Sequence, residues 1–385
     1  ERNLTDLYPI LGVENDCILS KQGDITVGFD VRLPEIFTLS NEEYESFHHS
    51  WVKAIKVLPK QSIFHKQDWF IESKYAADFD RADSSLLTRS SERFFNERLY
   101  LDHSCYLFLT KKPAGRKLSS SALSNLLRKT IVPAETMNAA LIQEFLDSAG
   151  QFKRILEESG FIRMRRLSDG DLLSSGDKSG LIEKYFFLEE GKERIIKDIS
   201  FQDGLRVGNQ FCQLYTLANP NDLPALCGSR INYDRYSTDK TKYPVGFASV
   251  LGQLLACNHI YNQFIFIEDP QRTIRDLESK KLRLQSLSTY SRENATARDS
   301  VNEFLNEAVA DGRMPVKAHF NVLAWAKEKE RLKDIRNAVS AALAQMDAVP
   351  KLEVDGAAQI HWAAIPGNGA EFPMNDSFDS FAEQA

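Results

Sequence analysis

The chain has 385 residues, which is long for a single hydrophobic core and predicts two or three domains. Its composition, 43% hydrophobic and 26% charged, is typical of a folded globular protein and indicates no general disorder. The net charge of −6 argues against a dedicated DNA-binding domain, which usually carries a basic face. A local basic patch can still lie within this acidic total.

The sequence predicts a protein without a membrane anchor. Its opening residues do not resemble a signal peptide, and the apolar run at residues 262–267 is far shorter than the roughly 18 residues of a spanning helix. The five cysteines are far apart and have no CxxC spacing, which is typical of reduced thiols rather than of a disulfide framework. We therefore expect a cytoplasmic protein whose association with a membrane is at most peripheral.

The first hundred residues predict alternating strands and helices. Residues 24–33 alternate apolar and polar side chains, as in a half-buried strand, and residues 21–24 predict a hairpin turn from a short strand at 17–19. Ser40 and Glu43 form a capping box that opens a helix with one apolar face. Three further elements are expected here: a strand at 63–73, a helix at 91–101 and a strand at 105–109.

The middle of the chain is predicted to be mainly helical, and the last third returns to alternating strands and helices. A basic, serine-rich loop at residues 111–121 separates the middle from the first part. In the middle we expect helices at 121–129, 134–158 and 180–190, with a short segment at 161–166. In the last third we expect strands at 210–217, 259–267, 316–325 and 349–354, a broken helical stretch at 270–310 and a helix at 332–346.

These elements predict an α/β (α+β) fold of two lobes, each of the split β-α-β, ferredoxin-like type on a mixed or antiparallel sheet, with a helical insert between them. Apolar residues have the same spacing in the helices at 44–58 and 332–346, which indicates either a structural duplication or the ordinary pattern of an amphipathic helix. The expected domains are a first α/β lobe at 1–115, a mainly helical insert at 116–200, a second α/β lobe at 201–365 and a tail at 366–385.

The sequence contains no recognisable catalytic or nucleotide-binding motif. A P-loop requires GxxxxGK[ST], because backbone amides must surround the phosphates and a lysine must follow the last glycine. The nearest segment, residues 170–179, has one residue too many between its glycines and would place Asp177 beside the phosphates, so we interpret it as a flexible loop. No GxGxxG follows a predicted strand, and no GxSxG is present. We predict no catalytic residue, nucleotide-binding residue or cofactor in this chain.

The histidines do not indicate a metal site. His48 and His49 are adjacent on a predicted helix and therefore point in different directions, and the other five are isolated in the sequence. One alternative is an independent enzyme whose site is assembled from distant residues. Its candidates for convergence in a pocket are Trp69, Tyr75, His103 and His259.

Clusters of basic residues are the candidate binding residues. Nucleic acid or anionic headgroups could use such clusters, because each basic side chain near an anionic surface contributes about 1 kcal/mol. The ordinary interpretation is a solvated loop or outer face. The predicted anion or partner patch consists of Lys111, Lys112, Arg163, Arg165 and Arg166. A further cluster consists of Lys280, Lys281 and Arg283.

Several stretches, in collinear order, resemble one family. They are residues 11–19 (LGVENDCIL), 53–59 (KAIKVLP), 65–70 (HKQDWF), 95–98 (FNER), 103–110 (HSCYLFLT), 257–263 (CNHIYNQ) and 365–368 (IPGN). They resemble the N-terminal part of the TraG-family conjugative-transposon ATPases, which are relatives of the largest type IV secretion ATPase. The resemblance covers nearly the whole chain.

This resemblance implies the docking and oligomerisation region of an ATPase that energises DNA and protein transfer and pilus assembly. It implies inner-membrane components of the secretion channel as partners, self-association of the full-length parent as a hexamer, and a cytoplasmic location peripheral to the inner membrane. The sequence ends before any Walker motif, so ATP and Mg²⁺ are expected in the full-length parent and no ATP hydrolysis by this part. The alternatives are a DNA-contacting domain of the transfer machinery and the independent enzyme described above.

Overall fold

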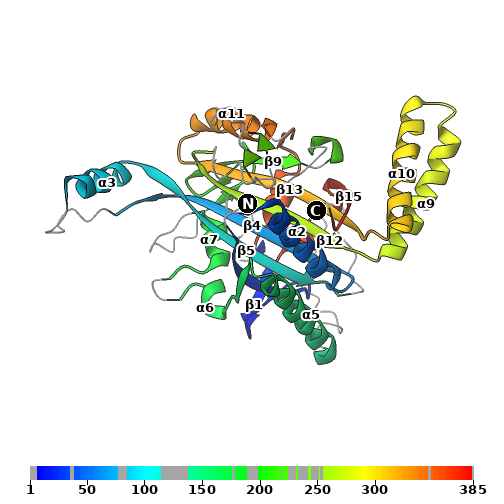
Figure 1. Ribbon diagram of the computed structural model, residues 1–385, viewed down its shortest axis with the longest axis horizontal. Helices are drawn as coiled ribbons and strands as arrows, with labels where there is room; N and C mark the ends of the chain where they lie inside the picture. The colour runs from blue at the N-terminus through cyan, green and yellow to red at the C-terminus, as the bar shows by residue number, and fades with distance from the viewer. Residues whose placement is uncertain are drawn as a thin grey trace.

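A computed structural model describes residues 7–34, 39–76, 85–113, 138–175, 178–188, 198–217, 219–223, 231–232, 242–243, 251, 255–345 and 348–383. The helix predicted at 121–129 lies outside these residues. Within the described residues, thirteen strands form one open antiparallel sheet with helices on both of its faces (Figure 1). The predicted α/β (α+β) class is therefore confirmed.

The first half of the sheet has the strand order of a split β-α-β fold. Its strands lie in the order β6-β3-β5-β4, so that β5 lies between the two strands that the first helix connects. That helix begins with the predicted capping box, in which Ser40 and Glu43 exchange hydrogen bonds. The bounds are β3 Ile25–Arg32, α2 Asn41–Lys56, β4 Ser62–Lys74, α3 Leu86–Asn96, β5 Leu99–Lys111, α5 Ala139–Glu158 and β6 Arg163–Arg166.

The second half repeats this strand order as β14-β9-β13-β12. The hairpin of β12 and β13 carries α9 and α10, at the position where the hairpin of β4 and β5 carries α3. Most of the connection from β9 to β12 lies outside the described residues. The bounds are β9 Gln210–Leu217, β12 Asn258–Ile267, α9 Pro270–Leu287, α10 Arg292–Ala310, β13 Pro315–Ala326, α11 Arg331–Ala344 and β14 Lys351–Glu353.

The topology is duplicated, but the two helices with equally spaced apolar residues are not counterparts. Helix α2 connects the first and second strands of its half, whereas α11 follows the third strand of its half and corresponds to α5. Equal spacing reflects only that each helix buries one face, which any amphipathic helix does. The spacing therefore could not identify equivalent positions.

Strands β4 and β12 join the two halves edge to edge, pairing from Ser62 with Ile267 to Phe70 with His259. On one face of this joint, buried polar side chains form a row across three strands. Gln67 Nε2 donates to Asn262 Oδ1 at 2.9 Å, and Asn262 Nδ2 donates to Asn321 Oδ1 at 2.9 Å. A shift of one residue would move these groups to the other face and leave them unpaired, so they fix the register of the joint.

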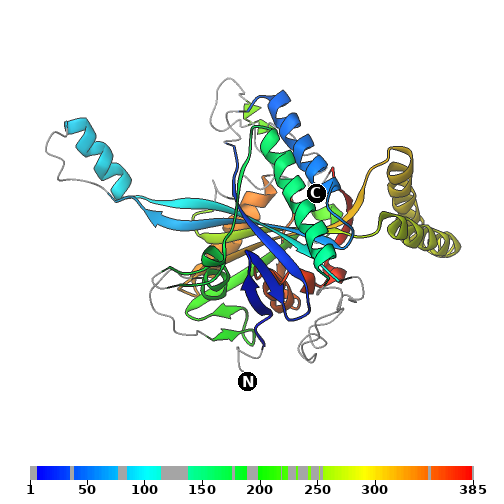
Figure 2. The same cartoon turned by 90° about the horizontal axis from the view of Figure 1, so that it is seen from below.

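Helices cover both faces of the sheet. Helices α2 and α5 pack on one face of the first half, and α11 packs on the same face of the second half (Figure 2). On the other face, α7 and α12 cover the joint. The strand predicted to be half-buried, β3, is therefore buried on both sides. Its Gly28 faces Leu167 and Phe108, and a Cβ there would lie 2.9 Å from Leu167 Cδ1.

The other elements extend or cover the sheet. They are β1 Ile10–Glu14, β2 Cys17–Ser20, α6 Asp169–Leu172, α7 Leu181–Phe187, β7 Ile199–Ser200, β8 Arg206–Val207, η3 Pro220–Asp222, β10 Ile231–Asn232, β11 Lys242–Tyr243, α12 Ala357–Ala363, η4 Gly369–Glu371, η5 Met374–Asp376 and β15 Phe378–Phe381.

Three predicted boundaries differ from the structure. The helix expected at 91–101 is α3, which ends earlier because residues 99–101 pair with β4 as the start of β5. The segment expected within a helical insert, 161–166, contributes β6 to the first half of the sheet. The expected tail contains β15, which pairs with β13 from Pro315 to Ala318. In each segment the pairing within the sheet satisfies backbone hydrogen-bonding groups.

Candidate functional site

The structure does not bring the five residues of the predicted anion patch together. Lys111 lies opposite Ile25 at the start of β3, whereas Arg163 lies opposite Arg32 at the other end of that strand. At about 3.3 Å per residue, roughly 23 Å separates the two positions. Lys112 is buried, and this burial lowers the pKa of its ammonium to about 8. A single anion-binding patch is therefore not formed by these side chains.

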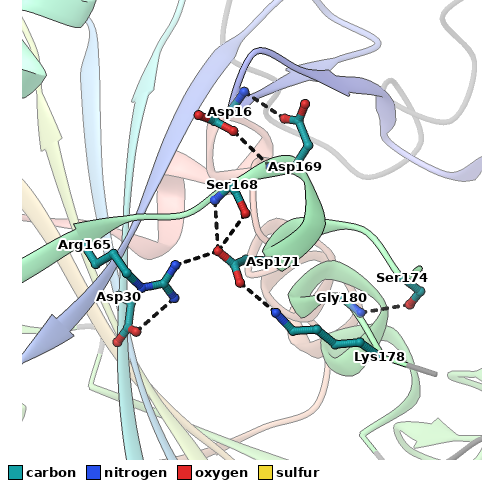
Figure 3. Close-up of polar contacts among 9 residues, drawn as sticks. All are labelled: Asp16, Asp30, Arg165, Ser168, Asp169, Asp171, Ser174, Lys178 and Gly180. Atoms are coloured by element: carbon teal, nitrogen blue, oxygen red, sulfur yellow. Dashed lines mark hydrogen bonds and ion pairs between the residues drawn. The ribbon is translucent and has the colours of Figure 1, made fainter. Parts of the chain in front are cut away.

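Arg165 and Arg166 bind groups of their own chain, and Figure 3 shows the two carboxylates that Arg165 contacts. Arg165 Nη1 lies 2.7 Å from Asp171 Oδ2, and its Nη2 lies 3.2 Å from Asp30 Oδ2. Arg166 Nη2 donates to the carbonyl oxygen of Asn15 at 3.2 Å. Because these guanidinium groups already have acceptors, they hold β6 to the neighbouring elements rather than presenting free positive charge.

In the segment at residues 170–179, which departs from a P-loop, the described side chains gather around Asp171 (Figure 3). Lys178 Nζ lies 2.8 Å from Asp171 Oδ1, and Ser168 Oγ donates to Asp171 Oδ2 at 2.9 Å. These contacts, led by the hydrogen bond from Lys178, hold the pKa of the Asp171 carboxyl below its usual range. The lysine that a P-loop would direct at phosphate instead pairs with an aspartate, and part of the predicted loop forms α6.

Of the four residues of the enzyme alternative, two converge. Phe70 lies between His103 and His259, with its ring centroid 4.6 Å from each imidazole. Trp69 directly precedes Phe70, so its side chain lies on the opposite face of β4, where it packs in the core. Tyr75 follows the outer end of β4, away from both histidines. The four residues therefore do not line one pocket.

A charged cluster lies beside this ring stack. Asp68 accepts a hydrogen bond from His103 Nε2 at 2.9 Å and also pairs with Lys66. Burial raises the pKa of Asp68, but Lys66 and His103 outweigh that effect and bring it to about 2. Burial raises the pKa of the neighbouring Cys105 thiol well above its usual value, which keeps it protonated and unreactive. This cluster is a satisfied ion-pair network rather than an activated catalytic group.

Two further kinds of site are absent from the described part of the chain. No group of three or more histidine, cysteine, aspartate or glutamate side chains there could hold a metal ion. None of the described helices is both long enough and apolar enough to cross a membrane.

A group of exposed large apolar side chains lies on the α3 arm, which we define as α3 with the outer ends of β4 and β5 (residues 71–76 and 85–104). The arm extends away from the rest of the molecule (Figures 1 and 2), and α3 has no buried residue. Soluble proteins rarely expose contiguous large apolar side chains without a binding role. The exposed ones are Tyr75 (39%), Leu86 (85%), Leu87 (80%), Phe94 (50%), Phe95 (55%), Leu99 (65%) and Tyr100 (50%).

Local contacts keep α3 ordered although it buries no side chain. Ser85 caps its first turn by accepting the Thr88 amide, and the Arg98 guanidinium lies 3.4 Å above the Phe94 ring centroid. Leu87 and Phe94 are seven residues apart and so share one helical face. A preformed amphipathic helix of this kind can bind in an apolar groove of a partner protein.

The sequence contains a pattern that corresponds to this surface. Its periodicity alone does not distinguish an exposed apolar face from the face of a core helix. The pairs Leu86-Leu87 and Phe94-Phe95 recur at helical spacing. Such spacing predicts an apolar face but not whether that face meets the protein's own core. Only the position of α3 at the end of a hairpin, beyond the covered sheet, shows that the face is free of other described elements.

The comparisons with known proteins are sparse. Residues 1–49, which include β1 to β3 and the start of α2, match the family described as "Domain of unknown function, B. Theta Gene description (DUF3875)". No curated protein matches the chain.

Proposed function

We propose that this chain is the docking and oligomerisation region of a type IV secretion ATPase of a conjugative transposon, and that the α3 arm binds its protein partner. The exposed apolar face of α3 is the observation that carries this proposal. The collinear resemblance to the TraG family supplies the partner class, inner-membrane components of the secretion channel. The chain is then cytoplasmic and peripheral to the membrane, and ATP and Mg²⁺ act in the motor of the parent, with a hexamer as the expected assembly.

The charges of the arm favour a protein groove over a lipid surface. Helices that lie on anionic membranes carry an excess of lysine and arginine on their polar face. On this arm the four lysine and arginine side chains are matched by four acidic ones; the basic residues are Lys74, Arg89, Arg93 and Arg98, and the acidic residues are Glu72, Glu92, Glu97 and Asp102. Arg93 and Glu97 pair with each other at 2.7 Å. A balanced polar face with a leucine and phenylalanine face suits a groove that is apolar at its centre and polar at its rim.

The proposal is tested by capturing the chain with each inner-membrane component of the transfer apparatus after co-expression. Truncating the apolar face with Leu87→Ser and Phe94→Ser together should reduce capture at least about tenfold, because central apolar anchors dominate interface energies. The matched control is Val354→Ser, which also removes an exposed apolar side chain, but on the body of the molecule (74% exposed). Equal capture of all three proteins would contradict the assignment of the arm.

The proposal also implies that this chain has no nucleotide site of its own, which a second experiment tests. Titration calorimetry of this chain with ATP and Mg²⁺ should give no heat of binding, because Lys178 of the nearest P-loop-like segment is paired with Asp171. Binding of ATP at micromolar concentration would count heavily against the proposal. The DNA-contacting alternative is tested by a gel-shift titration, whose affinity should fall steeply with salt if the basic residues bind phosphates.

A further inference from the structure

Helices α9 and α10 form a second arm, at the opposite end of the molecule from the α3 arm (Figures 1 and 2). The two helices pack on each other through a small core in which Leu277, Val301 and Leu305 are buried. Helix α9 follows β12 and α10 precedes β13, so the turn between the helices lies at the end of the arm that is farther from the sheet. The arm therefore presents this turn and the adjoining helix ends to the surroundings.

Charge is distributed unevenly along this arm. Its outer half, residues 280–299, has five basic and two acidic side chains, a net charge of +3. Its inner half, residues 270–279 and 300–310, has two basic and four acidic side chains, a net charge of −2. We define residues 280–292 as the hairpin tip. It contains no acidic side chain and four basic ones, which are Lys280, Lys281, Arg283 and Arg292.

The basic side chains of the hairpin tip are not neutralised within the protein. No carboxylate in the described part of the chain forms an ion pair with any of these four. The carboxylates of the arm that do form ion pairs have other partners: Asp276 pairs with Arg272, Asp299 with Arg298 and Glu307 with Arg313. The hairpin tip thus differs from β6, whose arginines already have acceptors, and it presents free positive charge.

Large apolar side chains are exposed among these charges: Leu282 (68%), Leu287 (42%) and Tyr290 (85%). Leu282 follows the buried Leu277 by five residues, which at about 100° per residue turns it to the side of α9 away from α10. The Tyr290 backbone N–H donates to the Leu287 carbonyl oxygen at 3.0 Å, and Asn294 Nδ2 donates to the same oxygen at 3.3 Å. A hydrogen-bonded turn therefore presents apolar side chains within a basic surface.

We propose that the hairpin tip binds the surface of a membrane that contains anionic lipids. Lysine and arginine are attracted to anionic headgroups. Leucine gains by entering the boundary between headgroups and acyl chains, and tyrosine concentrates there because its ring is apolar and its hydroxyl polar. Both kinds of exposed side chain thus gain from one surface. This inference rests on the peripheral membrane location in the proposed function, for which it names the contact surface and the lipid class.

Other partners fit the hairpin tip less well. A phosphate backbone contacts basic and polar side chains, and it would leave Leu282 and Leu287 without a partner. The polar-rimmed protein groove proposed for the α3 arm suits balanced charges, whereas the tip has four basic side chains and no acidic one. An anionic surface also repels the acidic inner half of the arm while it attracts the outer half. The charge distribution therefore orients the arm with its tip toward the membrane.

The test is sedimentation of the whole chain with vesicles, with no other protein present. The native chain should bind vesicles made of equal parts of phosphatidylglycerol and phosphatidylcholine and should not bind vesicles of phosphatidylcholine alone. Lys280→Glu with Arg283→Glu should weaken binding to the mixed vesicles at least about tenfold, because repulsion replaces attraction. Leu282→Ser with Tyr290→Ser should weaken it at least about fivefold, because the apolar contribution is lost at unchanged charge.

Two matched variants separate the hairpin tip from general changes of charge and apolar surface. Lys327→Glu with Lys329→Glu makes the same change of net charge at exposed positions before α11. Val309→Ser with Val354→Ser removes two exposed apolar side chains, one from the inner half of the arm and one from the body. Both variants should bind the mixed vesicles as the native chain does. Circular dichroism of every variant should match that of the native chain.

Several outcomes would overturn the proposal. They are a native chain that does not bind the mixed vesicles, binding that survives both tip variants, and equal loss of binding in the matched variants. Binding of duplex DNA in place of vesicles, lost with Lys280→Glu and Arg283→Glu but kept with Leu282→Ser and Tyr290→Ser, would assign the tip to nucleic acid.

The vesicle experiment is independent of docking through α3. Leu87→Ser with Phe94→Ser should leave vesicle binding unchanged, because the α3 arm is proposed to bind protein. A native chain that fails to bind vesicles but is still captured by its protein partner would refute the membrane contact alone. Loss of vesicle binding in the α3 variant would assign the lipid contact to the α3 arm and contradict both proposals.

Discussion

The two halves of the sheet share one strand order and differ at the ends of their hairpins. In the first half, β4 and β5 extend into an arm whose single helix exposes leucine and phenylalanine. In the second half, β12 and β13 carry two longer helices whose helical surfaces are divided by charge. The strands of both halves are buried on both faces near the joint, whereas both arms extend beyond the covered sheet.

This difference shows where a duplicated scaffold can acquire separate roles. Residues in the joint contact both halves, so a change there must preserve packing and hydrogen bonding on two sides. Residues on the arms contact few neighbours, so their chemistry can diverge without loss of the fold. An apolar arm and a charged arm at opposite ends then suit two different partners. The joint should therefore be more sensitive to change than either arm.

Acid should destabilise the joint strongly, because four buried histidines lie in or beside it. Burial lowers the pKa of His65 to about 3 and those of His259, His319 and His361 to about 4. Below about pH 6.5 the unfolded chain therefore binds protons that the folded chain does not, until the pH reaches about 4. The contribution of these histidines to the free energy of unfolding is fully present above this window. It is lost as the pH falls through the window, by up to about 1.4 kcal/mol per pH unit for each histidine.

Urea unfolding at pH 7, 6 and 5 measures this effect. The free energy of unfolding should fall by on the order of 5 kcal/mol from pH 7 to pH 5. The two halves should unfold together, since the histidines occupy β4, β12, β13 and α12. His361→Gln should make the pH dependence shallower by about one proton. Two separate transitions, or stability that does not change in this range, would show that the halves are not one cooperative unit.

Gly367 should be the next most sensitive position, because its loop packs against the first half beside the joint. Its φ is +88°, and a Cβ there would lie 2.6 Å from Ile18 Cγ2. Gly367→Ala should reduce the free energy of unfolding by about 2–4 kcal/mol through backbone strain and overpacking. Gly312→Ala is the matched control, because its φ is +62° but a Cβ would meet nothing within 4 Å. Equal losses in the two variants would show that packing against Ile18 is unimportant.

Removing a helix cap should have a smaller effect. The effect should extend to the whole chain for α2, which packs on the sheet, and should stay local for α3 on its arm. Ser40 caps α2, which packs in the core, and Ser85 caps α3, which buries no residue. Each change to alanine should cost about 1 kcal/mol of local helix stability. Ser40→Ala should lower the unfolding temperature of the whole chain, whereas Ser85→Ala should only speed hydrogen exchange of the α3 amides. A fall in global stability with Ser85→Ala would mean that α3 packs on the body in solution.

Much of the sheet was predictable because local signals and the fold agree. The alternation at β3, the capping box of α2 and the exact span of β9 follow from short-range rules. The joint between β4 and β12 was not predictable, because edge-to-edge pairing depends on which strand remains uncovered after the helices pack. The burial of polar residues at the joint was not predictable either. The sequence does not show that Gln67 and Asn262 hydrogen-bond to each other across the two halves.

The candidate surfaces show a similar limit. The basic residues near 111 and 163 share only their charge, because the length of β3 separates them. Arg165 in addition forms an ion pair with Asp171. Charge in a sequence does not show which carboxylate lies nearby. The α3 face was visible as spacing, yet spacing does not distinguish a core helix from one on an extended arm.

The direction of β4 and β12 has a mechanical consequence. Each strand leads at its C-terminal end into its own arm, and because the strands are antiparallel, the arms leave from opposite ends of the joint. A pull between a partner held by α3 and another held by α9 and α10 would load this strand pair along its axis, in shear. All the hydrogen bonds from Ser62–Ile267 to Phe70–His259 would then resist together rather than break one after another. The joint between the halves is thus oriented to carry tension between the two arms.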